Sequence, residues 1–425
     1  MEQISLAYGA QRLNVRLAGA GSITILEERA LTPIQDLPAA FSQAVENPIA
    51  SPPLRQVIDG RDCVTIVLSD ITRFWMRQDK ICALLTAYLH DVIGVPYDNM
   101  AILIALGTHR AQTEDELTTL VTPGVFARVR VYNHDCMADD LVEVGVTSRG
   151  TVVKVHPLAV GRKVILVGGT VHHLMAGFGG GRKNILPGIC AKSTINQNHL
   201  HSLSQTAPCS NPFIGTGKRA GNPIYEDMDE AAALVAPVFG INIVASGGAH
   251  CRLFCGHWRL AWEESCKVVQ EAMGVTIPHL ADVVVASAGG FPRDINLYQS
   301  IKTLLNASLA VKDGGSIYFL AECREGGGTP DFFGWLEPLR RGTLDAELRA
   351  NYSIGGYIFY AACEIMARAN VVMLTQLPPS LMADMRIRAY AEVADFQANL
   401  DVCGKSVYVM PRGGNTVPCL HGALG

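Results

Sequence analysis

Three residues that could do chemistry, Asp70, Thr72 and Arg73, follow directly after the apolar stretch from Cys63 to Leu68. The planar guanidinium of an arginine matches a carboxylate or a phosphate and can bind either through paired hydrogen bonds. A carboxylate and a hydroxyl beside it favour a turn that binds an anion. The alternative is that Asp70 caps a helix and Arg73 pairs with Asp70 alone.

A second apolar stretch, Met100 to Leu106, ends at Gly107 and is followed by Thr108 and His109. Glycine lets the chain turn sharply at this point. A neutral imidazole can accept a proton near pH 7, because its ordinary pKa is ~6.5. His109 is therefore a candidate acid or base, and an ordinary surface histidine is the alternative.

A glycine-rich segment from His172 to Gly188 is the most informative part of the chain. It carries His173 and Lys183 together with Gly177, Gly179, Gly180 and Gly181. Because glycine has no side chain, a ligand can approach the backbone there. A surface loop without a ligand is the alternative.

The glycine-rich segment does not match the common nucleotide motifs. The dinucleotide motif G-x-G-x-x-G needs glycine at its sixth position, where the sequence has Asn184 when counted from Gly179. In the P-loop a lysine follows glycine directly, but Arg182 stands between Gly181 and Lys183. Neither a Rossmann-type NAD site nor a Walker-type ATP site is supported.

Two further polar segments need an explanation. After Gly289 and Gly290, Tyr298, Gln299 and Lys302 lie in an expected helix, in which Gln299 and Lys302, three residues apart, share one face. That face is either a binding surface or an ordinary solvated one. The segment 250–257 contains two histidines and two cysteines, but its spacing matches no common zinc motif and its alternation equally predicts a β-hairpin.

The elements that carry these residues alternate between strands and helices. Apolar stretches at 63–68 and 100–106 flank a helix-length segment at 79–93, which is typical of a parallel α/β sheet, whose sites lie beyond the carboxyl ends of the strands. Alternation starts again after residue 275. We therefore predict two α/β domains with mainly parallel sheets, 1–275 with the cofactor-binding motifs and 276–425 with substrate-binding residues, and the active site in the cleft between them.

Composition excludes several classes of protein. The 425 residues have a formal net charge of −4 and a pI near 6.3, which does not favour binding to nucleic acid. The longest apolar stretches are far shorter than the ~20 residues of a membrane helix. The amino terminus lacks the pattern of a secretory signal, and the twelve cysteines are mostly single and in apolar surroundings. We expect a cytoplasmic protein without disulfides.

Over nearly its whole length the chain resembles the nickel-dependent lactate racemases and related 2-hydroxy-acid racemases and epimerases. The resemblance rests on the Asp70 turn, the motif 107–110, the block 173–199, the block 287–302 and the motif 321–326. It implies a nickel pincer nucleotide, a pyridinium mononucleotide whose two sulfur-bearing arms hold nickel. It also implies maturation enzymes that make this cofactor, and a small 2-hydroxy acid as substrate.

The resemblance implies a role for each candidate residue. Lys183 would carry the cofactor as a thioamide, and His199 would be the nickel ligand from the protein. His109 and His173 would be the acid/base pair, with His173 chosen over His172 because it lies ten residues before Lys183. The remaining roles are cofactor binding for Asp70, Thr72, Gly179, Gly180 and Gly181, and substrate binding for Arg73, Tyr298, Gln299 and Lys302.

The implied reaction inverts C2 of the acid by transient hydride transfer to the cofactor, while a histidine takes the hydroxyl proton. A nicotinamide-dependent 2-hydroxy-acid dehydrogenase and a non-catalytic nickel- or nucleotide-binding protein are the alternatives. The chain departs from the family at Ile71 and at Phe74-Trp75, where a histidine and a proline are common around Thr-Arg. Phe74 and Trp75 either shape the pocket or pack in the core, and an aromatic residue from Tyr357 to Tyr360 would lie near the cofactor.

Overall fold

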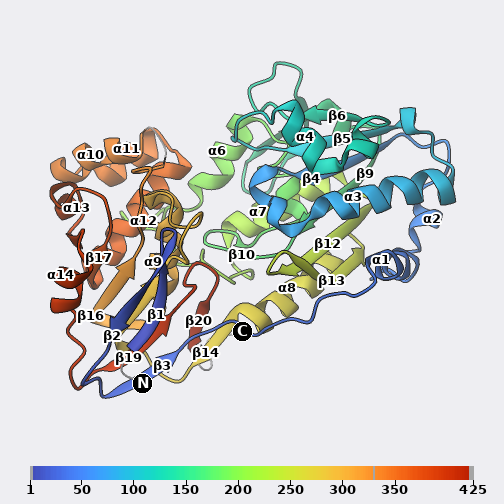
Figure 1. The fold of residues 1–425 in the computed structure, drawn as a ribbon. Helices are drawn as coiled ribbons and strands as arrows, with labels where there is room; N and C mark the ends of the chain where they lie inside the picture. The colour runs from blue at the N-terminus through green and yellow to red at the C-terminus, as the bar shows by residue number, and fades with distance from the viewer. Residues whose placement is uncertain (1–2, 329–330, 421–425) are drawn as a thin grey trace. The chain divides into compact units, whose positions relative to one another are not determined.

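The computed structural model describes residues 3–328 and 331–420. They divide into two compact units, each with its own sheet. The C-terminal unit takes the described residues of Met1–Arg29, Ser202–Asn211 and Glu271–Gly425, and the N-terminal unit consists of Ala30–His201 and Pro212–Gln270. Figure 1 shows the elements of both units in the colours of the chain.

The N-terminal unit is built on a six-stranded sheet in the order β13-β12-β9-β4-β5-β6. Its strands are β4 (Val64–Ser69), β5 (Met100–Ala105), β6 (Arg130–Asn133), β9 (Lys163–Gly169), β12 (Phe239–Ser246) and β13 (Ala249–Gly256). All neighbours are parallel except β12 and β13. The central strands are almost entirely buried, as apolar β-branched sequences covered on both faces require.

Helices pack apolar faces onto this sheet. The helices α3 (Gln78–Ala87) and α4 (Glu114–Val121) contribute Ile81, Leu85 and Leu120 to one apolar core with strand residues such as Ile66 and Ile102. Figure 1 shows α3 lying across β4, β5 and β9. The rest of the unit contains α1 (Leu37–Glu46), α2 (Leu54–Val57), α5 (Pro123–Phe126), α6 (Lys192–Leu200), α7 (Pro223–Val235) and two small hairpins, β7-β8 (Val142–Val146, Val152–Val155) and β10-β11 (His172–His173, Gly177–Phe178).

The C-terminal unit contains a second six-stranded sheet, in the order β18-β17-β16-β15-β19-β3, and all its neighbouring strands are parallel. Its strands are β3 (Ser22–Ile25), β15 (Ala281–Ser287), β16 (Val311–Leu320), β17 (Asn370–Leu374), β18 (Ile387–Tyr390) and β19 (Ser406–Met410). Its longest helices are α9 (Leu297–Ala307) and α12 (Ile354–Arg368). The predicted class, two α/β units with mainly parallel sheets, is confirmed.

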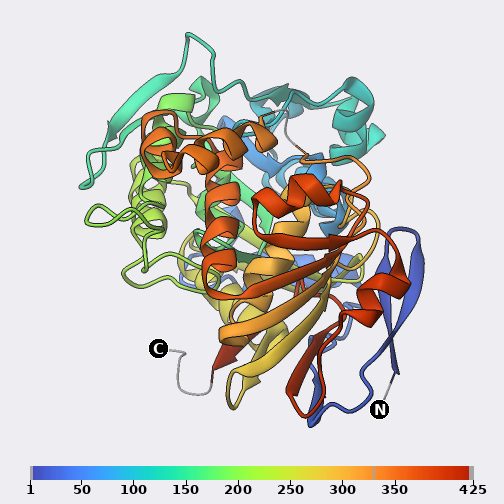
Figure 2. The same cartoon turned by 90° about the vertical axis from the view of Figure 1, so that its left-hand side faces the viewer.

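Residues 3–29 belong to the C-terminal unit, whereas the predicted domain boundaries place them in the N-terminal domain. The hairpin of β1 (Gln3–Tyr8) and β2 (Gln11–Arg16) buries Leu6 and Val15 against Val285 of β15. The backbone N–H of Gly9 donates to a carboxylate oxygen of Asp294 at 2.6 Å. Figure 2 shows the hairpin and α12 on opposite sides of the sheet. Because Gly9 and Asp294 are 285 positions apart in the sequence, no local sequence pattern predicts this contact.

The segment 250–257 forms most of strand β13, which pairs with β12 through a turn at Gly247 and Gly248. The segment is thus one strand of a β-hairpin whose turn precedes it, and the chain does not form a hairpin within 250–257 itself. Within residues 3–328 and 331–420 no group of three or more histidine, cysteine or acidic side chains is arranged to hold a metal ion. All twelve cysteines are free, and no helix in the described part of the chain is long and apolar enough to cross a membrane.

Candidate active site

Asp70 and His109 form a hydrogen-bonded pair at the carboxyl end of the N-terminal sheet. Asp70 follows β4 and His109 follows β5, and these neighbouring parallel strands bring together two residues 39 positions apart. One oxygen of Asp70 accepts from the backbone N–H of Thr72 at 3.1 Å and from its hydroxyl at 2.6 Å. The other oxygen contacts Nδ1 of His109. Asp70 therefore caps the 3-10 helix Ile71–Met76 and also orients His109.

The charge of Asp70 decides the tautomer of His109. Burial of Asp70 raises the pKa of its carboxyl, but the hydrogen bond and charge of His109, the Thr72 hydroxyl and Arg73 together hold it below the ordinary value of 3.8. An ionised carboxylate can only accept, so Nδ1 of His109 carries the hydrogen and Nε2 presents its lone pair. With about half of its side chain exposed, His109 has the arrangement of a general base supported by a buried aspartate.

The loop that carries His109 is fastened to the end of the glycine-rich segment. The backbone N–H of Gly107 donates to the carbonyl of Gly188 at 2.9 Å. Gly107 has φ +57°, and a Cβ there would lie 3.3 Å from Pro187. A residue with a side chain would be strained at this point, so this glycine sets the position of His109.

His173 lies in the small strand β10 and has the opposite tautomer. Its Nδ1 accepts the backbone N–H groups of Met175 at 3.3 Å and Ala176 at 3.1 Å. Neutral His173 therefore carries its hydrogen on Nε2. The neighbouring His172 is packed instead, stacked on Phe178 with centroids 4.9 Å apart and bonded through Nε2 to Gln270 at 3.0 Å.

Lys183 lies in the 3-10 helix Gly181–Asn184 and is partly buried. Burial, together with the charges of Arg182 and Arg73, lowers the pKa of Lys183 from 10.5 to about 7. A substantial fraction of its amine is then neutral at neutral pH. A neutral amine is a nucleophile that can be acylated.

Three of the four glycines before Lys183 are required by packing against the protein itself. A Cβ at Gly180 would lie 2.6 Å from the carbonyl oxygen of Gly169, and one at Gly181 would lie 2.7 Å from the ring of Trp262. At Gly177 a Cβ would lie 2.1 Å from the carbonyl oxygen of Lys218. The ligand approach that we expected to explain these glycines is thus not needed to account for them.

His199 lies in α6 and is 3 % exposed. Its Nδ1 donates to the carbonyl of Ile195 at 2.9 Å, so Nε2 presents a lone pair. Burial and the nearby charge of Lys183 lower the pKa of His199 to about 3, which keeps the imidazole neutral. A neutral imidazole held by a backbone carbonyl through its other nitrogen is the usual form of a metal-binding histidine.

The candidate substrate residues of the C-terminal unit lie on α9. Asn296 caps this helix by accepting the N–H of Gln299 at 2.9 Å, and Nζ of Lys302 donates to Oε1 of Gln299 at 2.8 Å. The predicted common face of Gln299 and Lys302 is confirmed. Tyr298 packs edge-on against Phe332 with centroids 6.4 Å apart. The predicted location of the active site between the domains stays a prediction.

Aromatic residues at and beyond the positions where the chain departs from the family pattern differ in burial. Phe74 packs against the core of the N-terminal unit, whereas Trp75 is 43 % exposed. Tyr357, Phe359 and Tyr360 are buried in α12, and Tyr360 donates to Asp345 at 2.9 Å. They serve the packing of the C-terminal unit.

Two residues that sequence reasoning passed over help to shape the site. The amide of Asn184 donates to the carbonyl of Val167 at 2.8 Å, and the Ser69 hydroxyl donates to its side-chain oxygen at 3.2 Å. Asn184 thus ties the Lys183 loop to the ends of β4 and β9. Arg182 is buried beside Lys183. Because both residues are adjacent to Lys183 in the sequence, that adjacency could have marked them as candidate site residues.

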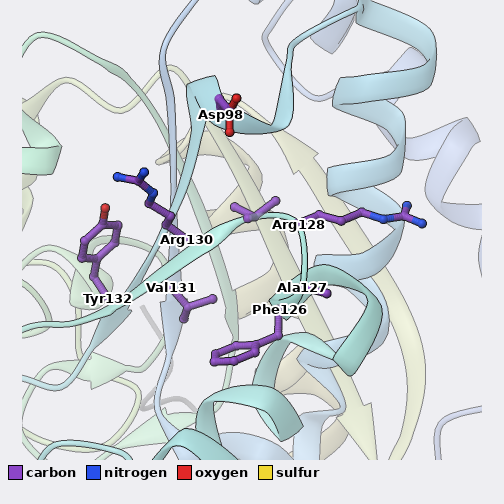
Figure 3. Close-up of a pocket in the computed structure, with 8 residues that line it drawn as sticks. Asp98, Phe126, Ala127, Arg128, Arg130, Val131 and Tyr132 are labelled. Carbon is purple, nitrogen blue, oxygen red and sulfur yellow. The ribbon is translucent and has the colours of Figure 1, made fainter.

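A pocket of about 440 Å³ lies elsewhere in the N-terminal unit, along the edge strand β6. Figure 3 shows it lined by side chains that include Asp98, Phe126, Arg128 and Tyr132. It contains none of the candidate site residues.

Comparison with known proteins identifies the family. A model of the lactate racemase N-terminal domain matches residues 8–210, and a model of the lactate racemase C-terminal domain matches residues 277–413. A lactate racemase of Thermoanaerobacterium thermosaccharolyticum is 31% identical over 342 residues, which are 79% of this chain and 78% of that protein. The chain belongs to the lactate racemase family.

Other members of the lactate racemase family agree with this assignment. A lactate racemase of Lactiplantibacillus plantarum is 30% identical over 294 residues, which are 68% of this chain and 67% of that protein. The solved structure of the lactate racemase apoprotein from Thermoanaerobacterium thermosaccharolyticum superposes with a TM-score of 0.85 at 27% identity. That comparison covers 98% of this chain and 100% of the other.

The residues of this lactate racemase family member fit a covalently held metal cofactor. Lys183 offers a neutral amine for attachment, and His199 offers a buried lone pair. When Lys183 is protonated, its charge lowers the pKa of His199, so the two side chains are close enough to interact. A cofactor that brings most of its own metal ligands needs only one from the protein.

Proposed function

We propose that the protein is a racemase or epimerase that inverts C2 of a 2-hydroxy acid of the lactate type and uses a nickel pincer nucleotide. The observation that carries the proposal is the Asp70–His109 pair, a general base on an exposed imidazole, in one unit with the neutral amine of Lys183. Lys183 would hold the cofactor and His199 its metal. When bound, this cofactor supplies a reversible acceptor for the hydrogen at C2 with its electron pair.

The chain's own residues bind the substrate and move its hydroxyl proton. Arg73 donates through Nη1 to the Thr72 hydroxyl at 3.1 Å, which orients its guanidinium for the substrate carboxylate. His109 takes the hydroxyl proton on Nε2, and the Asp70 carboxylate stabilises the imidazolium that forms.

Loss of the C2 hydrogen leaves a planar 2-oxo acid, which can take the hydrogen back on either face. His173 would stand on the other side of the substrate and exchange the proton when the hydroxyl points toward it. On the strength of the resemblance, Lys302 is assigned with Arg73 to binding of the substrate carboxylate, and Tyr298 and Gln299 are placed near it.

The test is an assay of protein made together with the cofactor-maturation enzymes, against single enantiomers of several 2-hydroxy acids. Lactate deuterated at C2 is expected to racemise in ordinary water with most of its deuterium retained. His172→Asn is the matched control for His173→Asn, and only the second is expected to lose activity. Washout of the label at partial conversion would refute the hydride route. Release of 2-oxo acid that depends on added NAD⁺, with formation of NADH, would favour a dehydrogenase.

Intact mass is an independent test of the attachment. The loaded chain is expected to exceed the mass of its sequence, and Lys183→Ala is expected to remove the excess. An adduct that persists in this variant would place the cofactor at another residue.

A further inference from the structure

Asp227 of α7 joins three segments of the N-terminal unit through one buried side chain that is 0 % exposed. Its Oδ1 accepts the hydroxyl hydrogen of Thr147 at 2.5 Å, and its Oδ2 accepts that of Thr151 at 2.9 Å. These threonines flank the turn of the β7-β8 hairpin. Oδ2 also accepts from Nδ2 of Asn198 in α6, at 2.8 Å. A polar group buried away from water needs such partners, so the three donors hold the carboxyl in one position.

Helix α6 depends on polar contacts for its orientation. A helix usually packs a stripe of apolar residues against the core, but α6 has only Ile195 and Leu200, and Leu200 is 38 % exposed. Strand β8 supplies polar contacts. The backbone N–H of Val152 donates to Oε1 of Gln197 at 2.9 Å, and the hydroxyl of Thr194 donates to the carbonyl of Val152 at 2.7 Å. Side chains of α6 thus make the hydrogen bonds that a neighbouring strand would make with β8.

The contact with Asp227 lies directly beside His199. Asn198 is four residues after Thr194 and therefore lies on the face of α6 that contacts β8. His199 is the next residue, and its Nδ1 donates to the carbonyl of Ile195 in the same helix at 2.9 Å. Because the imidazole is fixed to its own helix, any rotation or shift of α6 moves Nε2 of His199 with it. The hydrogen bond from Asn198 to Asp227 therefore helps to set where this lone pair points.

Two other acidic side chains of α7 hold the same hairpin. Glu230 accepts from the backbone N–H and from the hydroxyl of Ser148, both at 2.6 Å. Glu226 pairs with Arg149. Neither carboxylate has a hydrogen bond to α6 in the part of the chain that the structure describes. The contact with α6 distinguishes Asp227 from these neighbours.

We propose that Asp227 is a positioning residue for the metal of the cofactor: it fastens Asn198 and so fixes the direction of Nε2 of His199. The proposal rests on the proposed function, in which His199 binds the metal. A metal–nitrogen bond tolerates errors of only a few tenths of an ångström, so a loosened α6 holds the metal less tightly. Changes to residues that orient a metal ligand typically cost about 10- to 100-fold in metal affinity.

The test measures how firmly the loaded protein holds nickel. Wild type and Asp227→Ala are made together with the cofactor-maturation enzymes, and the covalent adduct is quantified by intact mass. Both proteins are then placed in EDTA at pH 7, and the nickel that remains per adduct is followed by metal analysis. Asp227→Ala is expected to keep the adduct and to release nickel at least about tenfold faster than the wild type. Release at the wild-type rate would overturn the proposal.

Glu230→Gln is the matched control, because it weakens the contact of α7 with the same hairpin and changes no contact of α6. This variant is expected to release nickel at the wild-type rate. Release as fast as from Asp227→Ala would mean that any loosening of the hairpin is sufficient, which would overturn the specific role of Asp227.

Asn198→Ala tests the route from Asp227 to the metal. It removes the donor on α6, leaves both threonines on Asp227, and is expected to release nickel as fast as Asp227→Ala. The double variant is expected to be no faster than Asn198→Ala alone, since Asp227 then has no contact with α6 to lose. Wild-type release from Asn198→Ala would overturn the proposal even if Asp227→Ala does not fold. Effects that multiply in the double variant would reveal another route and would also overturn it.

Failure of this proposal can be told apart from failure of the proposed function. Full retention of nickel in His199→Ala would refute the metal-binding role of His199. Loss of nickel from His199→Ala, together with wild-type release from Asp227→Ala and Asn198→Ala, would refute only the role of Asp227.

Discussion

The low pKa of Lys183 predicts that this lysine destabilises the folded protein at neutral pH. Its pKa is about 7 in the folded chain against 10.5 for an ordinary lysine. Between these values the unfolded chain binds a proton that the folded chain does not, so stability rises with pH across that window. Lys183→Met removes the group and should therefore stabilise the protein without cofactor at pH 7.

The magnitude follows from the difference of the two pKa values. Linkage gives a penalty of about 4 kcal/mol at pH 7 and about 1 kcal/mol at pH 10. Lys183 is only partly buried, and solvent lowers such penalties. We therefore expect Lys183→Met to gain roughly 2 to 4 kcal/mol at pH 7 and to lose most of that advantage by pH 10.

The assay is urea unfolding of the wild type and of Lys183→Met, followed by circular dichroism at pH 7 and pH 10. The difference between the two proteins cancels the titration of all other groups. Lys192→Met, at a half-buried lysine of α6 in the same unit, reports the effect of removing a lysine elsewhere. Equal stabilities of wild type and Lys183→Met at pH 7, or a gap that does not change with pH, would refute the reasoning.

Three further predictions concern the other site residues. His109→Ala is expected to lower kcat/KM of the loaded enzyme for both enantiomers by ~10²- to 10⁴-fold, and Asp70→Asn is expected to lower kcat/KM by a smaller factor. Chiral chromatography measures the activity of both variants, and full activity of either variant would remove that residue from the mechanism. His199→Ala is expected to lose nickel in metal analysis and to keep the mass of the covalent adduct, so wild-type nickel content would contradict its role. Phe74→Ala is expected to lower the free energy of unfolding by about 1 to 3 kcal/mol, and Trp75→Ala, at a residue that is 43 % exposed, by less than about 1 kcal/mol; similar losses in the two variants would contradict the packing described.

Local sequence patterns were enough to predict the strands β4 and β5 and the polar residues that follow them. Apolar stretches of strand length that end in polar residues predicted β4 and β5, and they predicted that Asp70 and His109 lie at one edge of a sheet. Helical spacing predicted the shared face of Gln299 and Lys302. Both predictions use geometry that repeats along the chain and needs no distant contact.

Local sequence patterns did not predict contacts between residues that are far apart in the sequence. The hairpin of β1 and β2 joins the C-terminal unit through contacts such as Gly9 with Asp294, which no local spacing reveals. The glycines at 180 and 181 are explained by Gly169 and Trp262, so the motif could be recognised but its physical reason could not.

By itself the sequence determined which groups are available: a lysine in a glycine-rich loop, three histidines in suitable motifs and an arginine after a strand. Only the tertiary structure decided their chemical state. Nδ1 of His109 donates to Asp70, whereas Nδ1 of His173 accepts from the backbone. Lys183 has a lowered pKa because of its burial and of the charges beside it. Residue type sets the ordinary pKa, but tautomer and protonation depend on desolvation and on partners that folding brings within a few ångströms.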